Sequence, residues 1–158
     1  MAFYNCTRLR RICSDTDGVA YFPNVTSITG DHSLNVGSST IKYLYLPKIT
    51  TQSGWSFRGR TLLVDWGPNI TSINASYLTM NPVICRAKTP PSLSRNTSTH
   101  ISSYAFVPAD CVDTYKSTGN WATYFSSNIK AIGGDEWIAT FGSADEYADY
   151  DLYGVPHS

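Results

Sequence analysis

The sequence predicts a β-rich repeat solenoid, and the prediction rests on an internal repeat and on the short strands that precede each repeat's proline. Pro23-Asn24-Val25-Thr26-Ser27-Ile28 recurs as Pro68-Asn69-Ile70-Thr71-Ser72-Ile73. A weaker copy, Pro47-Lys48-Ile49-Thr50-Thr51, lies between them. The resulting period of about 22 residues is too short for two helices and suits one strand plus one turn or short helical segment.

Composition agrees with strands and turns. The chain has 158 residues, of which 42% are hydrophobic and 15% charged. This length predicts one core, and the lack of any run of about eighteen apolar residues predicts no membrane-spanning helix. Ser, Thr, Asn and Tyr, which favour turns and strands, take the place of charged residues. Twelve basic residues balance twelve acidic ones, which argues against nucleic acid as a partner.

An extended run before each proline is the predicted strand of each unit. The runs are Ile41-Lys42-Tyr43-Leu44-Tyr45-Leu46, Leu62-Leu63-Val64-Asp65-Trp66 and Val83-Ile84-Cys85-Arg86-Ala87. In the first run, Ile41, Leu44 and Leu46 have the L-x-x-L-x-L spacing that points aliphatic side chains into a solenoid core. Proline then ends the ladder because it lacks an N–H donor, and the Asn-x-Thr/Ser after it offers hydrogen bonds to a turning backbone.

Several motifs in order resemble BspA-like, treponemal-type leucine-rich repeats. They are Ala2-Phe3-Tyr4-Asn5-Cys6-Thr7-Arg8-Leu9, Ser56-Phe57-Arg58-Gly59-Arg60-Thr61-Leu62, Asn69-Ile70-Thr71-Ser72-Ile73, and the terminal stretches Val83 to Pro91 and Phe106 to Ile132. The resemblance covers roughly residues 1–132 and implies a short leucine-rich-repeat array with a C-terminal helical cap. It also implies the roles of this family, which are those of surface adhesins and internalin-like binders of gut and oral bacteria.

Three segments follow from this assignment. Residues 1–108 are predicted as about four to five repeats, residues 109–132 as the helical cap, and residues 133–158 as an extra acidic aromatic tail. In the cap, Val112 and Tyr115 lie three residues apart and would face the last repeat. Because the chain begins inside a repeat, we expect either a longer protein or another chain to cover that open first repeat.

Charge divides the chain into a basic body and an acidic tail. All twelve basic residues lie at or before Lys130 together with six acids, whereas the last six acids follow it without a basic residue. Oppositely charged segments attract across roughly 10 Å in physiological salt. The tail is also too aromatic for a solvated linker. We therefore predict that it docks on the body or on a neighbouring subunit through Trp137, Tyr147, Tyr150 and Tyr153.

Motifs for catalysis and for metal binding are absent from the sequence. There is no G-x-S-x-G, no H-E-x-x-H and no phosphate-binding glycine loop. The histidines have no partner at metal-ligand spacing, so we predict no metal and no cofactor. The four cysteines, Cys6, Cys13, Cys85 and Cys111, form no C-x-x-C pair. Buried free thiols are therefore favoured over two disulfides.

The outward face of the strand ladder is the predicted ligand-binding surface. If Leu44 and Leu46 point inward, alternation sends Tyr43 and Tyr45 outward, and Tyr104 and Phe106 likewise. Arg86 joins them in one of the two registers open to its strand. A row of aromatic rings suits protein or carbohydrate ligands because each ring buries a large area and few rotatable bonds lose their freedom on binding. The alternative is that the rings only pack against one another along the ladder.

These features predict a non-enzymatic recognition or adhesion module that binds a protein or a carbohydrate through its strand face. The residues after Met1 contain no secretory signal, so a cell-surface or extracellular location requires that the chain be part of a longer exported protein. The alternative is a virion structural component, such as a phage tail fibre or appendage, which forms homo- or hetero-oligomers through the open first repeat and the tail. A hydrolase accessory domain is a weaker third possibility.

Overall fold

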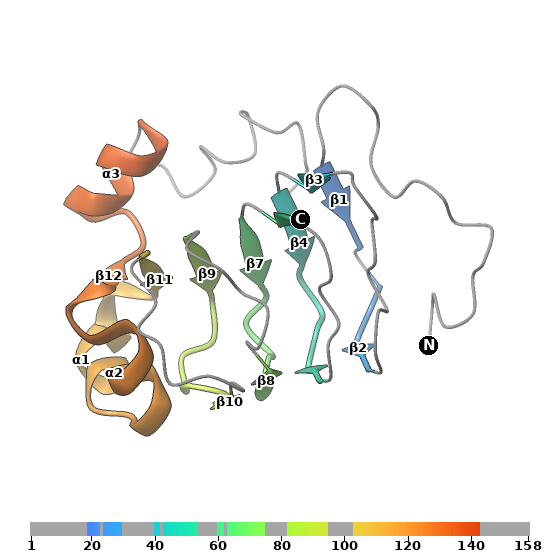
Figure 1. Ribbon diagram of the computed structural model, residues 1–158, viewed down its shortest axis with the longest axis horizontal. Helices are drawn as coiled ribbons and strands as arrows, with labels where there is room; N and C mark the ends of the chain where they lie inside the picture. The colour runs from blue at the N-terminus through green and yellow to red at the C-terminus, as the bar shows by residue number, and fades with distance from the viewer. Residues whose placement is uncertain are drawn as a thin grey trace.

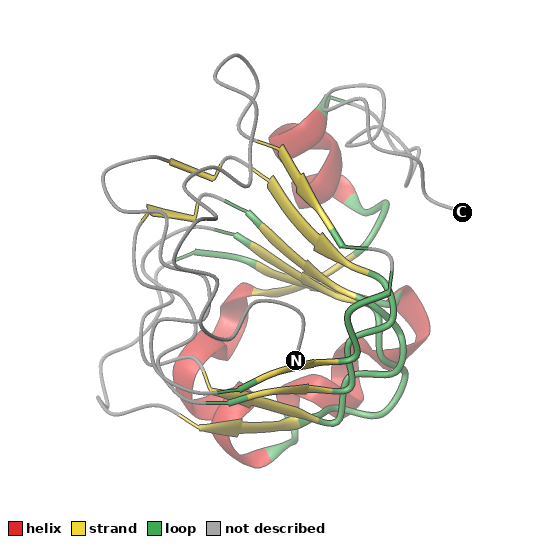
Figure 2. Ribbon diagram, turned by 90° about the vertical axis from the view of Figure 1, so that its right-hand side faces the viewer, coloured by secondary structure: helices red, strands yellow, loops and turns green. Residues whose placement is uncertain are grey.

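In the computed structural model, the described residues are 19–22, 24–29, 40–41, 43–53, 60–61, 63–74, 82–94 and 103–142. They form two larger parallel β-sheets whose strands lie side by side, a separate pair of short strands, and helices at one end (Figure 1). Figure 2 shows the sheets as two layers joined along one edge by turns. The helices of this described part are all too short or too polar to cross a bilayer. The predicted open first repeat lies outside the described residues.

The larger sheet has six strands, all parallel, in the order β1-β4-β7-β9-β11-β12. Its strands are β1 (Val19–Tyr21), β4 (Tyr43–Leu46), β7 (Val64–Trp66), β9 (Val83–Cys85), β11 (Ala105–Val107) and β12 (Ile129–Ala131). Leu44, Val64 and Val83 are register partners on three successive strands, and all three point into the core. The predicted inward position of Leu44 and Leu46 is therefore confirmed.

The smaller sheet has four parallel strands in the order β10-β8-β5-β2. Its strands are β2 (Ser27–Ile28), β5 (Thr51–Gln52), β8 (Ser72–Asn74) and β10 (Ser92–Ser94). Each strand pairs an outward hydroxyl residue with a buried one, as Ser72 and Ile73 do. A separate two-stranded pair joins β3 (Thr40–Ile41) to β6 (Arg60–Thr61).

The threonine that ends each proline-led turn motif (Thr26, Thr50 and Thr71) has a structural role in this sheet. The Thr50 hydroxyl donates to the Thr26 carbonyl at 2.8 Å, and the Thr71 hydroxyl donates to the Thr50 carbonyl at 2.9 Å. The backbone N–H of Thr71 bonds the same carbonyl of Thr50 at 2.8 Å. Each threonine therefore ties its unit to the preceding one, which explains why the repeat keeps a hydroxyl at this position.

From the turn 47–50 onward, the turns that connect the two sheets lengthen by one residue per unit, whereas the turn before it, residues 23–26, also contains four residues. Leu46, Trp66 and Cys85 are register partners, as are Thr51, Ser72 and Ser92. The turns between them are residues 47–50, 67–71 and 86–91, which contain four, five and six residues. The additional residue of the turn 67–71 is Gly67. A Cβ atom there would lie 2.0 Å from the carbonyl oxygen of Pro47, so only glycine fits against the preceding turn.

The main core lies between the two sheets and is closed by the helices at one end. These helices are α1 (Val112–Lys116) and α2 (Gly119–Phe125), flanked by the 3₁₀ turns η1 (Ala109–Cys111) and η2 (Ser126–Asn128). Tyr115 and Trp121 pack edge to face with centroids 4.9 Å apart, and Phe125 stacks on Trp121 at 5.5 Å. Tyr115 is fully buried and Val112 partly buried against the same core, so both face the sheets as predicted.

The predicted fold class, a short leucine-rich-repeat solenoid with a helical cap, is wrong. Two parallel sheets combined with helices give an α/β-like architecture instead. The reason is that the segment predicted as a turn alternates outward hydroxyls with inward aliphatic residues, and therefore pairs as a second strand. In addition, α1 and α2 connect β11 to its parallel neighbour β12, so the sheet continues past the segment predicted to end it.

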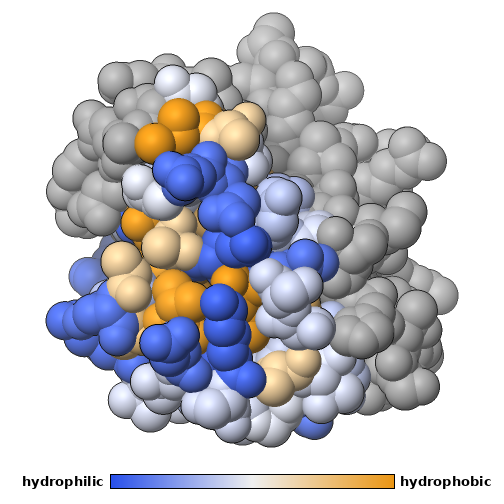
Figure 3. Space-filling model, turned by 90° about the vertical axis from the view of Figure 1, so that its left-hand side faces the viewer, coloured by the Kyte–Doolittle hydropathy of each residue, from blue (hydrophilic) through white to orange (hydrophobic). Residues whose placement is uncertain are grey.

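The first residues of the predicted tail form a third helix, α3 (Asp135–Phe141). It follows Gly133, whose φ is 77°, and ends at Gly142, whose φ is 81°. Figure 3 views the helical end of the molecule, where hydrophobic side chains show in two places between hydrophilic ones, the upper one over α3. Ile138 on this helix is 41% exposed, so only one side of α3 is used for packing.

Candidate functional site

The candidate site is the face of the six-stranded sheet that points away from the smaller sheet, which we call the outer face. Its central row consists of register partners on successive strands, in the order Tyr45, Asp65, Ile84, Phe106 and Lys130. Five strands thus place one side chain each at the same level of the sheet. The row combines two aromatic residues, one aliphatic residue and two charged ones.

The structure brings the five predicted ligand-binding residues onto this one face. Tyr43 and Tyr45 stack with centroids 6.1 Å apart, and Tyr104 and Phe106 lie 5.6 Å apart. Arg86 lies two residues after Ile84 and bonds Asp65, which settles the register that the sequence left open.

The expected exposure of this face is wrong for three of the five residues. Tyr43 and Phe106 are fully buried and Tyr45 is 5% exposed. Phe106 is covered by α3, and Tyr43 uses its hydroxyl in a buried hydrogen bond. Tyr104 and Arg86 remain partly exposed. A ligand that approaches this structure therefore meets Tyr104 and Arg86 before the buried rings.

A charged network crosses the middle of the outer face. The Arg86 guanidinium donates to both oxygens of Asp65, from Nε to Oδ1 at 2.9 Å and from Nη2 to Oδ2 at 2.8 Å. The Tyr43 hydroxyl donates to Oδ2 at 2.8 Å. The Asp65 side chain is fully buried, whereas that of Arg86 is 15% exposed. Donors on both oxygens stabilise the carboxylate as an anion, which suits a fixed structural charge better than proton transfer.

The sequence reasoning missed Asp65, although a signal was present. An acidic residue in the middle of the apolar run Leu63-Val64-Asp65-Trp66 is unusual for a strand with both faces covered. Such a residue needs a cationic partner nearby. The basic residue that occupies the corresponding place in the next unit is Arg86, and it supplies that partner.

The tail residue Trp137 docks on this face. Its ring is fully buried and packs nearly perpendicular to Phe106, with centroids 5.2 Å apart. Lys130 and Glu136 form an ion pair of 2.5 Å that joins the basic body to the acidic tail. This hydrogen bond to Lys130 holds the pKa of Glu136 below its ordinary value. Tyr147, Tyr150 and Tyr153 lie outside the described residues.

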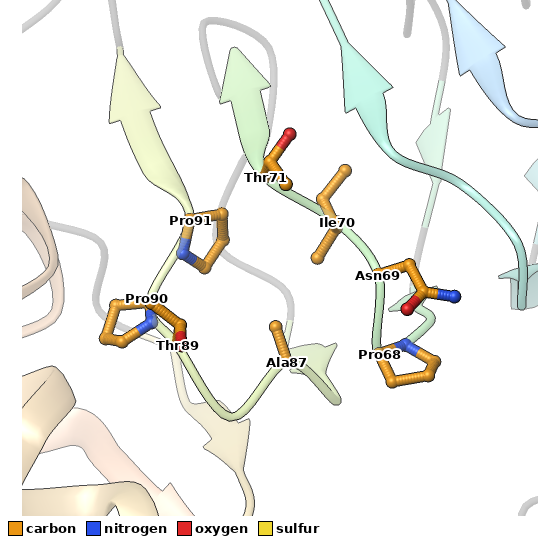
Figure 4. A pocket seen from close by; sticks show the side chains of 8 residues that line it. All are labelled: Pro68, Asn69, Ile70, Thr71, Ala87, Thr89, Pro90 and Pro91. Carbon is orange, nitrogen blue, oxygen red and sulfur yellow. The ribbon is translucent and has the colours of Figure 1, made fainter.

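A second concave place, a groove of about 350 Å³, lies between the turns 67–71 and 86–91 (Figure 4). Ile70, Ala87 and Pro91 point into the space between the turns, whereas the Asn69 amide points away from it. The groove occurs where a five-residue turn adjoins a six-residue turn. Its lining is uncharged, so it is a weaker candidate than the outer face.

The two cysteines among the described residues are buried free thiols, as predicted. Cys85 lies 3.2 Å from the hydroxyl of Tyr115, which donates to the carbonyl of Ala87 at 2.8 Å. Burial raises the pKa of Cys85 to about 11. In the described part of the chain, no three His, Cys, Asp or Glu side chains gather in a way that could hold a metal ion. Cys6 and Cys13 lie outside it.

Comparison with known proteins adds no assignment to this geometry. No protein-family model, no curated protein and no solved structure matches the chain. The resemblance to BspA-like repeats therefore stays a prediction from the motifs.

Proposed function

We propose that this chain is a non-enzymatic recognition module that binds a carbohydrate or protein ligand through the outer face of the six-stranded sheet. The observation that carries the proposal is the collection of Tyr43, Tyr45, Arg86, Tyr104 and Phe106 on that single face. The binding end is the pair Tyr104 and Phe106, because Tyr104 is partly exposed beside the buried ring of Phe106. Aromatic side chains give large contact areas at a low entropic cost, which is why binding surfaces use them.

The charged network supports recognition rather than chemistry at this face. Arg86 and Tyr43 hold Asp65 from both sides, so the carboxylate cannot turn toward a bound ligand without breaking three hydrogen bonds. Such a network keeps neighbouring side chains in fixed positions, and a pre-ordered surface loses less conformational entropy when a ligand binds.

An array that carries immobilised glycans and peptides tests the proposal. Wild-type protein is compared with Tyr104→Ala and with the matched control Tyr124→Ala, which removes a partly buried tyrosine from α2 at the opposite side of the sheet. We expect Tyr104→Ala to weaken binding at least about tenfold and Tyr124→Ala to leave it unchanged. Equal binding by the two variants, or no binding by the wild type to any glycan or peptide, would refute the proposal.

A further inference from the structure

Helix α3 covers one end of the outer face through a small aromatic cluster. Trp137 packs against Phe106 at 5.2 Å, and Phe141 lies 5.6 Å from Phe106 and 4.4 Å from Trp137. The partly buried Tyr104 and Ile132 complete the cluster. The residues that α3 covers are thus the same residues that form the binding end of the outer face.

The helix depends on this contact for its own stability. It has seven residues, whereas isolated helices shorter than about 12–15 residues are marginal in water. Gly133 precedes it and Gly142 ends it, both with a positive φ that other residues rarely adopt. Ile138 on the opposite side is exposed. If Trp137 leaves the sheet, the remaining local interactions are too few to keep the helix folded.

One polar group works against the docked position. The indole Nε1 of Trp137 is buried and finds no hydrogen-bond partner in the described part of the chain. By contrast, Nε1 of Trp121 in α2 donates to the carbonyl of Pro91 at 2.8 Å. A buried donor without a partner costs free energy that water returns when the group is exposed. The docked state of α3 is therefore weaker than the packing of its rings alone indicates.

We propose that α3 is a cover that opens on its own, undocking and unfolding while both sheets stay folded, and that its opening uncovers Phe106, beside the partly exposed Tyr104, for a ligand. The first half of this proposal stands on the packing of α3. The second half rests on the proposed function of the outer face. Segments with few buried contacts open locally at a lower free energy than the rest of a protein, and covers of binding sites come from such segments.

Native-state hydrogen exchange on the full chain measures the opening without any ligand. The reporters in α3 are the amides of Ile138 and Gly142, which bond the carbonyls of Gly134 and Ile138 at 2.9 and 2.7 Å. The reporters in the sheet are the amides of Leu44 and Arg86, bonded at 2.9 and 3.0 Å. We expect the α3 amides to exchange at least about 100-fold faster. Low urea should accelerate the sheet amides and leave the α3 amides nearly unchanged, because local opening exposes little surface.

Two variants test whether the hydrogen-exchange protection of α3 can be lost independently of that of the sheets. Trp137→Ala should remove the protection of the α3 amides and leave that of the sheet amides intact. The control Ile138→Ala, which changes an exposed neighbour on the same helix, should leave both sets unchanged. A single exchange rate with one urea dependence for all four amides in the wild type would overturn the proposal. Loss of sheet protection in Trp137→Ala equal to the loss in α3 would also overturn it.

The array used for the proposed function then tests whether the cover controls access. Because only the open form binds, apparent affinity scales with the open fraction, so Trp137→Ala should bind the array ligand at least about tenfold tighter than the wild type. If Trp137→Ala leaves α3 fully open and binds the array ligand no more tightly than the wild type, α3 does not control access to the outer face. If α3 opens but the array finds no ligand, the proposed function fails while the local opening stands.

Discussion

Arg86 and Asp65, which belong to successive units of the repeat, form a two-pronged ion pair in which the carboxylate is fully buried. Tyr43 from the unit before them donates to the same carboxylate. Three units thus contribute one side chain each to a single network. Their separations along the chain are 22 and 21 residues, so the network is a product of the repeat period.

Breaking this pair from one side should destabilise the protein strongly. Arg86→Met keeps much of the side-chain volume and leaves the Asp65 carboxylate buried without its guanidinium, which we expect to cost about 3–5 kcal/mol of the free energy of unfolding. Urea denaturation measures the loss. The double variant Arg86→Met, Asp65→Leu removes both charges and should regain most of it. A double variant no more stable than Arg86→Met would contradict this account.

Gly67→Ala should destabilise the fold because the added methyl group meets backbone atoms. The new Cβ would lie 2.0 Å from the Pro47 carbonyl oxygen, and a backbone atom cannot rotate away as the end of a side chain can. We expect a loss of about 1–3 kcal/mol, the usual cost of overpacking. Thermal unfolding compares it with Gly134→Ala, whose methyl group would approach no atom closer than 3.3 Å. Equal melting temperatures for the two variants would argue against the close approach of the two turns.

Cys85 should resist alkylation in the folded protein. Its pKa of about 11, raised by burial, leaves little of the reactive thiolate at pH 8. Mass spectrometry of tryptic peptides after iodoacetamide treatment reports each cysteine separately. We expect Cys85 to be unlabelled in the folded protein and labelled in urea. Rapid labelling of Cys85 under native conditions would show that the core opens near Tyr115.

Docking of α3 should weaken in acid. The pKa of Glu136 is lowered by its bond to Lys130, so the ion pair stabilises the docked helix above the ordinary carboxyl value of 4.5. That contribution is lost as the pH falls through the lowered value. The indole N–H resonance of Trp137 in NMR spectra reports the change, and that of Trp121 reports the core. Glu136→Gln should abolish the pH dependence of the Trp137 resonance, and a titration unaltered by this variant would contradict the assignment.

The repeat and the side-chain alternation were predictable from the sequence because both follow from local geometry. Alternation assigned Leu44 and Leu46 to the core and Tyr43 and Tyr45 to the opposite face. The second sheet was not predicted, since two- and three-residue strands such as Ser27–Ile28 and Ser72–Asn74 look like turn sequence. Their identity as strands comes from pairing with neighbouring units, which a single unit does not reveal.

The burial of the outer face was not predictable for a similar reason. Alternation states which face a ring points to, but not what lies above that face. Phe106 is covered by Trp137, a residue 31 positions later in the chain that follows two helices and another strand. The aromatic content of the tail suggested docking without naming the place. Only the fold of residues 109–134 brings Trp137 back over Phe106.

The increasing length of the turns has a consequence for assembly. Repeat units with identical turns can add copies at either end, and their open edges then favour fibres. Here the turns 23–26 and 47–50 contain four residues each, whereas 67–71 and 86–91 contain five and six, so a second copy whose first turn met the last turn would set a shorter turn against a longer one. The sheets also end in α1 and α2 on one side. At this end of the ladder, the unequal turns and the helices therefore oppose the addition of a second copy.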